Sequence, residues 1–198
     1  SDPRFKFVAA DLYHLPFAAG VLNAATMIRV IHHIADVPAA LKQIRRAMAP
    51  GGVFVLEYGN KRNVKAIARR SLGRQSWSPF AQEPVEFVKL NFDFHPKWMQ
   101  QQLAEAQFVT RHQLAVSYLR AGFVKRVLPL KAMVALDSAL QGTAGLGLLS
   151  PSVFTQNYAD NRQSPQPMPS QKLSGDAVFV NPRSGRPLRR DGDTLICD

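Results

Sequence analysis

The sequence has little cysteine and no long apolar run. Its single cysteine, Cys197, excludes a disulfide within the chain and a cysteine-rich zinc site. No run of about 18 uncharged apolar residues occurs, so we expect no transmembrane helix. No apolar signal region follows Ser1, and nothing else marks export. We therefore expect a cytoplasmic protein that does not associate with a membrane.

Acidic residues are scarce as well. The chain has 14 Asp and Glu residues against 25 Lys and Arg residues, which gives a formal net charge of +11. Its 198 residues are 46% hydrophobic and 20% charged, a composition typical of a globular protein with a real core. The length predicts one domain with an appendage, or two small domains. The positive excess keeps nucleic acid open as a partner.

The first 60 residues alternate between apolar runs and one clear helix. Residues 5–10, 24–31 and 53–58 read as strands, and the last of these is expected to be buried on both faces. Asp36 is the expected N-cap of the helix, which a Pro-Gly-Gly turn ends. The residues of this helix expected in the core are Val37, Ala40, Leu41, Ile44 and Met48. Strands that alternate with helices predict a parallel α/β sheet, whose ligands bind at the carboxyl ends of the strands.

The rest of the chain is less regular. The elements expected there are a basic helix at 60–74, an aromatic-rich lid at 77–95, a helix at 96–106, a strand at 109–118, a helix at 129–140 and a short strand at 153–154. In the 129–140 helix the candidate core residues are Leu130, Met133, Val134 and Leu140. The expected domain boundaries are 1–156 for the α/β part, 157–175 for a linker rich in Pro, Gln and Ser, and 176–198 for a tail module with two turns.

Three motifs in the first 60 residues carry a family resemblance. They are Asp11-Leu12-x-x-Leu15-Pro16-Phe17, then Ile31-His32-His33-Ile34-x-Asp36, then Leu41-x-x-Ile44-x-Arg46-x-Met48-x-Pro50-Gly51-Gly52. In this order and spacing they resemble the second half of a class I S-adenosylmethionine-dependent methyltransferase of the small-molecule type. The resemblance implies an α/β fold with a partial Rossmann-like sheet, strands three to seven with flanking helices, and an antiparallel final pair of strands. A small β-rich tail module would follow.

The resemblance also implies S-adenosylmethionine as cofactor and assigns residues to it. Asp11 matches the acidic residue that accepts a hydrogen bond from the adenine amino group, and Leu12 matches the neighbour that packs on the adenine ring. Arg29 and Val30 match the end of the fourth strand, whose backbone supports the methionine part of the cofactor. Asp11 also has a simpler interpretation, as a turn or capping residue.

His32 and His33 follow that strand end and would face the methyl acceptor. A histidine suits proton removal from a hydroxyl or phenol, because its pKa is near neutral. The alternative is that one ring packs or caps while the other is solvated. Glu57 and Tyr58 are expected to be wall residues rather than catalysts.

Two departures from the family pattern affect the expected activity. The glycine-rich cofactor turn and the acidic residue of the second strand have no counterpart, so we expect a chain that begins partway through a fold and holds about half of a cofactor pocket. The tail resembles a zinc ribbon whose first two ligand positions are Asn181 and Ser184. Because these residues supply no thiolate and only Cys197 remains, we expect no metal there.

These observations leave three functional hypotheses. The first is methyl transfer from S-adenosylmethionine to a small-molecule acceptor. The second is an RNA or other nucleic-acid methyltransferase that uses the basic helix at 61–74, which is otherwise a solvated charged face. The third is a catalytically inactive methyltransferase-like binding module that lacks the glycine-rich cofactor loop.

Overall fold

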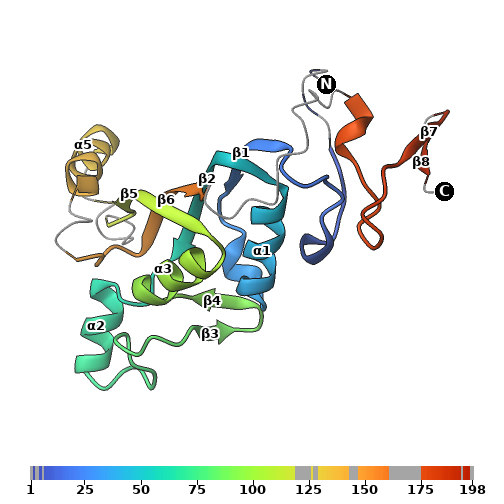
Figure 1. Cartoon of the computed structure of the whole chain (residues 1–198). Coiled ribbons are helices and arrows are strands. Elements are labelled where there is room, and N and C mark those ends of the chain that lie inside the picture. Colours follow the sequence, from blue (N-terminus) through green and yellow to red (C-terminus); the bar gives the residue numbers. More distant parts are fainter. Residues whose placement is uncertain are drawn as a thin grey trace.

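A four-stranded sheet forms the centre of the computed structural model, which describes residues 2, 5, 7–118, 126, 129–142, 147–160, 175–192 and 194–196. Its strands are β1 (Leu22–Met27), β2 (Met48–Gly59), β5 (Phe108–Val116) and β6 (Ser152–Ala159). The order across the sheet is β1-β2-β6-β5 (Figure 1). β1 and β2 are parallel, and β6 is antiparallel to both β2 and β5. The expected mixed α/β sheet with an antiparallel final pair is confirmed.

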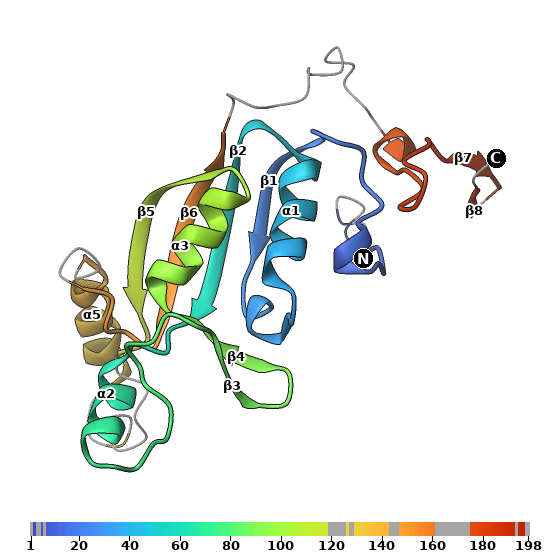
Figure 2. The ribbon, with the colours of Figure 1, turned by 60° about the horizontal axis from the view of Figure 1, so that its bottom comes forward.

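Two helices, α1 (Val37–Ala47) and α3 (Pro96–Glu105), cover one face of this sheet (Figure 2). Asp36 caps α1 as expected, because its carboxylate accepts a hydrogen bond of 2.9 Å from the backbone N–H of Ala39. His95 caps α3 in a similar way. The core residues expected for the first helix are all buried: Val37, Ala40, Leu41, Ile44 and Met48.

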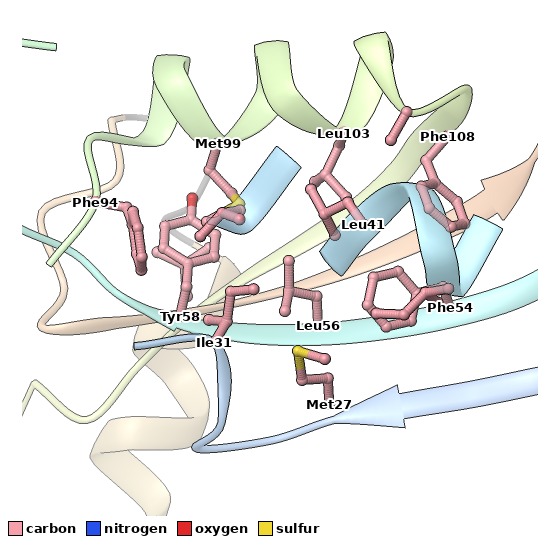
Figure 3. Close-up of a cluster of buried hydrophobic side chains, with 14 of the residues drawn as sticks. Met27, Ile31, Leu41, Phe54, Leu56, Tyr58, Phe94, Met99, Leu103 and Phe108 are labelled. Atoms are coloured by element: carbon pink, nitrogen blue, oxygen red, sulfur yellow. The ribbon is translucent and has the colours of Figure 1, made fainter. Parts of the chain in front are cut away.

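The core lies between β2 and these two helices. Phe54, Leu56 and Tyr58 point from β2 toward α1 and α3, where they meet the fully buried Met99 and Leu103 (Figure 3). Each buried side chain of this size contributes about 1.5–3 kcal/mol relative to an exposed one. The packing of this cluster therefore fixes both helices on the sheet.

The opposite face of β2 is only half-buried. Val53, Val55 and Glu57 alternate with the core residues and are partly exposed. The expectation that residues 53–58 are buried on both faces is therefore wrong. A continuous apolar run usually indicates two covered faces, but α1 and α3 cover only one face of this strand.

The strand expected at residues 5–10 is also wrong. Residues 7–10 form no strand and are exposed, with Phe7 90% exposed. The sheet starts at β1, and no described strand pairs with residues 7–10. An apolar run forms a strand only where a neighbour takes its backbone hydrogen bonds. The sheet thus contains four of the five strands that the resemblance implied.

The strand expected at 153–154 is much longer and more central than its sequence indicated. β6 runs to Ala159 and pairs on both sides. Asn157 is completely buried, and its amide donates to the backbone carbonyl of Phe54 at 3.1 Å. The α/β part therefore extends beyond the boundary expected at residue 156, and residues 161–174 of the expected linker lie outside the described residues.

The middle of the chain adds peripheral elements: α2 (Val64–Ser71), β3 (Val85–Val88), β4 (Asn91–Asp93) and α5 (Leu130–Gln141). β3 and β4 form an antiparallel hairpin within the segment expected to be a lid. The helix expected near 129–140 is confirmed, but its assignment to the core is wrong. Leu130 is 71% exposed, Val134 is 60% exposed, and no described residue of α5 is buried.

The tail consists of a short 3-10 helix, η4 (Gly175–Val178), and a hairpin of β7 (Arg189–Asp191) and β8 (Thr194–Ile196). Both expected turns are present. The Asn181 side chain accepts hydrogen bonds from the backbone N–H groups of Arg183 and Ser184, at 2.8 and 3.1 Å. At the position where the resemblance placed a metal ligand, an asparagine thus closes its own turn.

The described residues include neither a membrane-spanning helix nor a metal cluster. No helix among them is long and apolar enough to cross a membrane. Likewise, no three His, Cys, Asp or Glu side chains in the described ranges gather where they could hold a metal ion. Cys197 lies outside these ranges.

Candidate functional site

The candidate site lies at the carboxyl ends of β1 and β2. Figure 2 shows both strands ending on the side of the molecule where the β3–β4 hairpin lies. A turn after β1 leads into a short 3-10 helix, η2 (Ile31–His33), which directly precedes α1. A second 3-10 helix, η1 (Leu12–His14), contacts α1. Segments that are far apart in the sequence therefore meet at one edge of the sheet.

Hydrogen bonds from Asp36, the N-cap of α1, and from Arg46 within α1 hold the η1 loop in place. The backbone N–H of Asp36 donates to the hydroxyl of Tyr13 at 3.1 Å. Arg46 donates to two backbone carbonyls of the loop, those of Phe17 at 2.7 Å and Leu15 at 2.8 Å. The rigid helix thus positions the loop that carries Asp11.

Asp11 is the N-cap of η1, in agreement with the simpler of its two interpretations. One carboxylate oxygen accepts from the N–H of Tyr13 at 2.9 Å, and the other accepts from Nδ1 of His14 at 2.8 Å. The bond from His14 and then the bond from Tyr13 lower the pKa of Asp11. The side chain is 55% exposed. A carboxylate has about four lone-pair sites, so Asp11 keeps acceptor capacity toward an incoming amino group.

Leu12, the expected partner of the adenine ring, is half-buried and packs against the core cluster. One side of Leu12 is therefore fixed, while the rest remains accessible. A fixed apolar side chain beside an exposed carboxylate suits a flat ring that carries an exocyclic amine. The residues present fit the adenine part of S-adenosylmethionine.

The turn after β1 has an unusual backbone. Arg29 has a φ of 59°, in the left-handed region that side-chain-bearing residues rarely adopt. Its N–H donates to Oε2 of Glu57 at 2.9 Å. The other carboxylate oxygen of Glu57 accepts a short hydrogen bond from the Ser152 hydroxyl. Val30, which follows, is 42% exposed.

His32 and His33 lie against each other, with ring centroids 4.1 Å apart. Nδ1 of His33 lies 2.9 Å from the backbone carbonyl oxygen of Leu90, in the turn between β3 and β4. Because a carbonyl only accepts, this Nδ1 carries the proton, and Nε2 of a neutral His33 has the free lone pair. The bond also attaches the hairpin to the turn after β1.

Burial, followed by the charge of His33, lowers the pKa of His32, while the charge of Glu57 opposes this effect. His32 is therefore mostly neutral at pH 7. A neutral imidazole can accept a proton, as the base interpretation of this residue requires.

A second polar cluster lies between the hairpin and α2. Lys61 is 2% exposed, and its Nζ donates to the carbonyl of Glu83 at 2.6 Å and lies 5.8 Å from the Trp77 ring centroid. Burial raises the pKa of Asp93 to about 6, against the opposing charge of Lys61. Asp93 lies directly against Gly59, where a side chain would collide with its carboxylate.

This second cluster changes the expected basic surface at 61–74. Lys61 is buried and Arg62 is half-buried, so neither belongs to an exposed patch. Arg70 binds the carbonyls of Gln75 and Ser76 beyond the end of α2. The other basic residues of this segment are exposed: Lys65, Arg69 and Arg74.

Comparison with known proteins agrees with this geometry. Residues 1–56 match the family model described as a methyltransferase domain. No curated protein sequence matches the chain. Among solved structures, a chain from the complex of the Haloferax volcanii Trm112 methyltransferase activator with a methyltransferase is 14% identical. It superposes with a TM-score of 0.51, over 81% of this chain and 64% of that one.

Two further structures superpose equally well. The [4+2]-cyclase SpnF has a TM-score of 0.51 at 15% identity, over 80% of this chain and 58% of its own. An S-adenosylmethionine-dependent methyltransferase from Listeria monocytogenes has a TM-score of 0.51 at 12% identity, over 81% of this chain and 71% of its own. The chain spans less than two thirds of the length of the Haloferax and SpnF chains.

Residues 1–56 match the methyltransferase domain model, and the chain has the fold of the class I S-adenosylmethionine-dependent methyltransferases. S-adenosylmethionine is the cofactor of this class. The expected fold is confirmed, and the match over residues 1–56 agrees with the family resemblance. Because the same fold occurs in a cyclase, the fold alone does not specify the reaction.

Sequence reasoning missed the contacts that connect the site. It found the two histidines but not the bond from His33 to Leu90, and it treated Glu57 as a wall residue. One signal for Glu57 was present, because it is the only charged residue within the apolar run 53–58. A partly buried charge is costly unless it is hydrogen-bonded or paired, so such a residue is expected to have a partner. The partners, Arg29 and Ser152, are visible only in the structure.

Proposed function

We propose that this chain binds S-adenosylmethionine at the carboxyl ends of β1 and β2 and acts in methyl transfer to a small-molecule acceptor. The observation that carries the proposal is the meeting of the Asp11 loop, the turn at Arg29 and the histidine pair at one edge of the sheet. Ligands of open α/β sheets bind at this edge. The family match over residues 1–56 supports the same assignment.

In this proposal each segment has a distinct role. Asp11 accepts a hydrogen bond from the adenine amino group, and Leu12 covers one face of the ring. The backbone of Arg29 and Val30 supports the methionine part. When bound, S-adenosylmethionine supplies an electrophilic methyl group on its sulfonium. The protein then mainly positions the acceptor, which is a large part of the catalysis of a bimolecular step.

His32 and His33 are the candidate bases for an acceptor that must lose a proton. The lowered pKa of His32 keeps its ring able to accept that proton at neutral pH. His33 has its Nδ1 proton engaged by Leu90, so its Nε2 is the atom that would act. Of the two, His33 is the better oriented because its tautomer is fixed.

The β3–β4 hairpin supports a small acceptor rather than a polymer. It is attached to the turn after β1 through His33 and presents three exposed apolar side chains, those of Phe87, Val88 and Leu90. A hairpin held at the site restricts the space above it. Its apolar residues suit an acceptor with an apolar part.

Calorimetric titration of the full protein with S-adenosylmethionine tests this proposal, using Asp11→Ala and the neighbouring His14→Ala. Asp11→Ala should weaken binding about 10- to 100-fold, because it removes a hydrogen bond to a charged group. His14→Ala frees one oxygen of Asp11 and should leave binding unchanged or tighter. Equal losses in both variants would contradict a direct role for the Asp11 carboxylate.

The unaltered protein provides the stricter test. Measurable binding of S-adenosylmethionine is expected. If the protein does not bind it at millimolar concentrations, the proposal fails, and the inactive binding module becomes the better description.

The exposure of Lys65, Arg69 and Arg74 on and just after α2 supports a second candidate, methylation of a nucleic acid. Counterion release would make RNA binding depend steeply on salt. With three phosphate contacts to single-stranded RNA, the slope of log K against log salt would be about −2. A combined Lys65→Ala, Arg69→Ala and Arg74→Ala variant should abolish that slope. If RNA binding is absent or insensitive to salt in the unaltered protein, this candidate is excluded.

A further inference from the structure

We propose that Glu57 is a positioning residue, whose carboxylate holds the turn at Arg29 in the conformation that the candidate cofactor and acceptor sites share. The proposed consequence for cofactor binding rests on the function proposed above. The geometric part does not, and it can be tested without any ligand.

The contacts of Glu57 bridge three strands of the sheet. The residue itself is near the end of β2. Its Oε2 accepts from the N–H of Arg29, just beyond the end of β1, at 2.9 Å. Its Oε1 accepts from the hydroxyl of Ser152, the first residue of β6. The oxygen of this hydroxyl also lies 3.3 Å from the carbonyl oxygen of Tyr58. One carboxylate therefore fixes the end of β1 relative to its neighbours.

The turn needs such a partner because its backbone is strained. Arg29 is in the left-handed region at φ 59°, where the Cβ of an L-residue crowds its own backbone. This strain persists only where the surroundings enforce the conformation. A charge-assisted bond from the Arg29 N–H to a carboxylate is stronger than a bond to a neutral acceptor. Glu57 is thus suited to hold a conformation that Arg29 would otherwise leave.

The same carboxylate acts on the neighbouring histidine through its charge. The charged or titratable groups that act on His32 are His33, Arg29 and Glu57. His33 and Arg29 lower the pKa of His32, as burial does, and Glu57 alone raises it. Removing the charge of Glu57 would therefore lower the pKa of His32 further and reduce its basicity.

Position and charge can be separated by two substitutions. Glu57→Gln removes the charge but keeps an oxygen that can accept from Arg29. Glu57→Ala removes both. Glu105→Gln, at the end of α3 away from the site, is the matched control for loss of one negative charge. Ser152→Ala removes the other partner of Glu57 while leaving the bond to Arg29.

The first measurements use NMR on the protein without ligand. In Glu57→Ala, amide exchange of Arg29 should accelerate about tenfold or more, as expected for the loss of one charge-assisted hydrogen bond. In Glu57→Gln, the exchange rate should change much less, whereas the pKa of the His32 ring should fall. Neither Glu105→Gln nor Ser152→Ala should reproduce the pair of effects.

These measurements can overturn the inference. If Arg29 exchange is unchanged in Glu57→Ala while the fold is intact by circular dichroism, Glu57 does not hold the turn. If Glu57→Ala does not fold, Glu57→Gln provides the test, because a neutral acceptor holds the Arg29 N–H less tightly than a carboxylate. Unchanged Arg29 exchange together with an unchanged His32 titration in Glu57→Gln would then overturn the inference.

The ligand-bound measurement separates this inference from the proposed function. If Glu57→Ala loosens the turn and also weakens S-adenosylmethionine binding at least tenfold, both stand. If the turn loosens but the unaltered protein binds no S-adenosylmethionine, the proposed function fails and the positioning of Arg29 by Glu57 remains. If binding is normal in Glu57→Ala although the turn is loose, cofactor binding does not depend on this turn.

Discussion

The ring of Phe179 in the tail lies against the ring of Phe17, with centroids 5.8 Å apart. Backbone hydrogen bonds flank this contact, from Ala18 to the carbonyl of Val178 at 2.8 Å and from Val180 to the carbonyl of Pro16 at 3.0 Å. Figure 1 shows the tail beside the N-terminal segment. The tail is therefore docked on the loop that also carries Asp11.

Replacing Phe179 should loosen this docking. Phe179→Ala removes the aromatic contact and part of the buried area, and a half-buried ring of this kind is worth about 1–2 kcal/mol. The amides of Ala18 and Val180 should exchange about 10-fold faster as a result. Hydrogen exchange measures this directly. Phe179→Leu, which keeps an apolar side chain, is the milder control, and unchanged exchange in Phe179→Ala would show that backbone pairing alone holds the tail.

The buried hydroxyl of Tyr58 offers a stabilising substitution. It is completely buried, points toward Met99 in Figure 3, and has no hydrogen-bond partner among the described residues. An unsatisfied buried hydroxyl costs about 1–3 kcal/mol. Tyr58→Phe should therefore increase the free energy of unfolding by about 1 kcal/mol or more, measured by urea denaturation.

Tyr158 provides the comparison for this experiment. Its hydroxyl accepts a hydrogen bond from Gln156 at 3.0 Å, so Tyr158→Phe should give no gain. Equal stability changes in the two variants, or a loss in Tyr58→Phe, would indicate that a bound water satisfies the Tyr58 hydroxyl.

Asp93 should make stability depend on pH. Burial raises its pKa to about 6 from an ordinary value of 3.8, so the folded protein retains this proton over a range where the unfolded chain releases it. The contribution of Asp93 to the free energy of unfolding therefore falls by about 3 kcal/mol as the pH rises from about 4 to about 6. Asp93→Asn cannot ionise and should lack this decrease.

Urea denaturation at pH 4 and pH 7.5 measures the difference. The gain of Asp93→Asn over the unaltered protein should be larger at pH 7.5 than at pH 4. Asp191→Asn, on the exposed tail hairpin, should show no such pH-dependent gain. If the Asp93 and Asp191 variants behave alike, the buried carboxyl does not titrate as described.

Gln107 occupies a position that favours glycine. It follows α3 with a φ of 62°, and its N–H donates to the carbonyl of Ala104 at 2.9 Å, which closes the helix end. The left-handed conformation costs an L-residue about 1–2 kcal/mol, a cost that glycine does not have. About half of this gain is lost, because a glycine makes the unfolded chain more flexible and so raises the entropy lost on folding. Gln107→Gly should therefore stabilise the protein by about 0.5–1 kcal/mol in thermal or urea denaturation. Gln107→Ala should give no comparable gain, and a stabilising alanine would contradict the role of the backbone angle.

The sequence alone was sufficient where structure follows from local pattern. The apolar stripe and the Asp36 cap determined α1 and its buried face, because these signals act within a few residues. The Pro-Gly-Gly segment expected to form a turn after the helix instead lies within β2. The motif around Asp11 and the histidine pair indicated the family for the same reason. The sequence also indicated that the turn at Arg29 and the end of β2 lie together, because the carboxyl ends of parallel strands meet at one edge of a sheet. The strand expected before Asp11 does not form, so its position at this edge did not follow from the same rule.

Tertiary structure decided what depends on neighbours distant in sequence. β6 is a central strand because β2 and β5 satisfy both of its edges, although only two of its residues indicated a strand. Residues 7–10 are apolar but pair with no described strand, and α5 is rich in apolar residues although none of its described residues is buried. An apolar sequence favours burial, but only the rest of the fold decides whether a partner surface is there. The bonds of Glu57 to Arg29 and of His33 to Leu90 arise in the same way. No local pattern encodes them, since each joins segments that only folding brings within hydrogen-bonding distance.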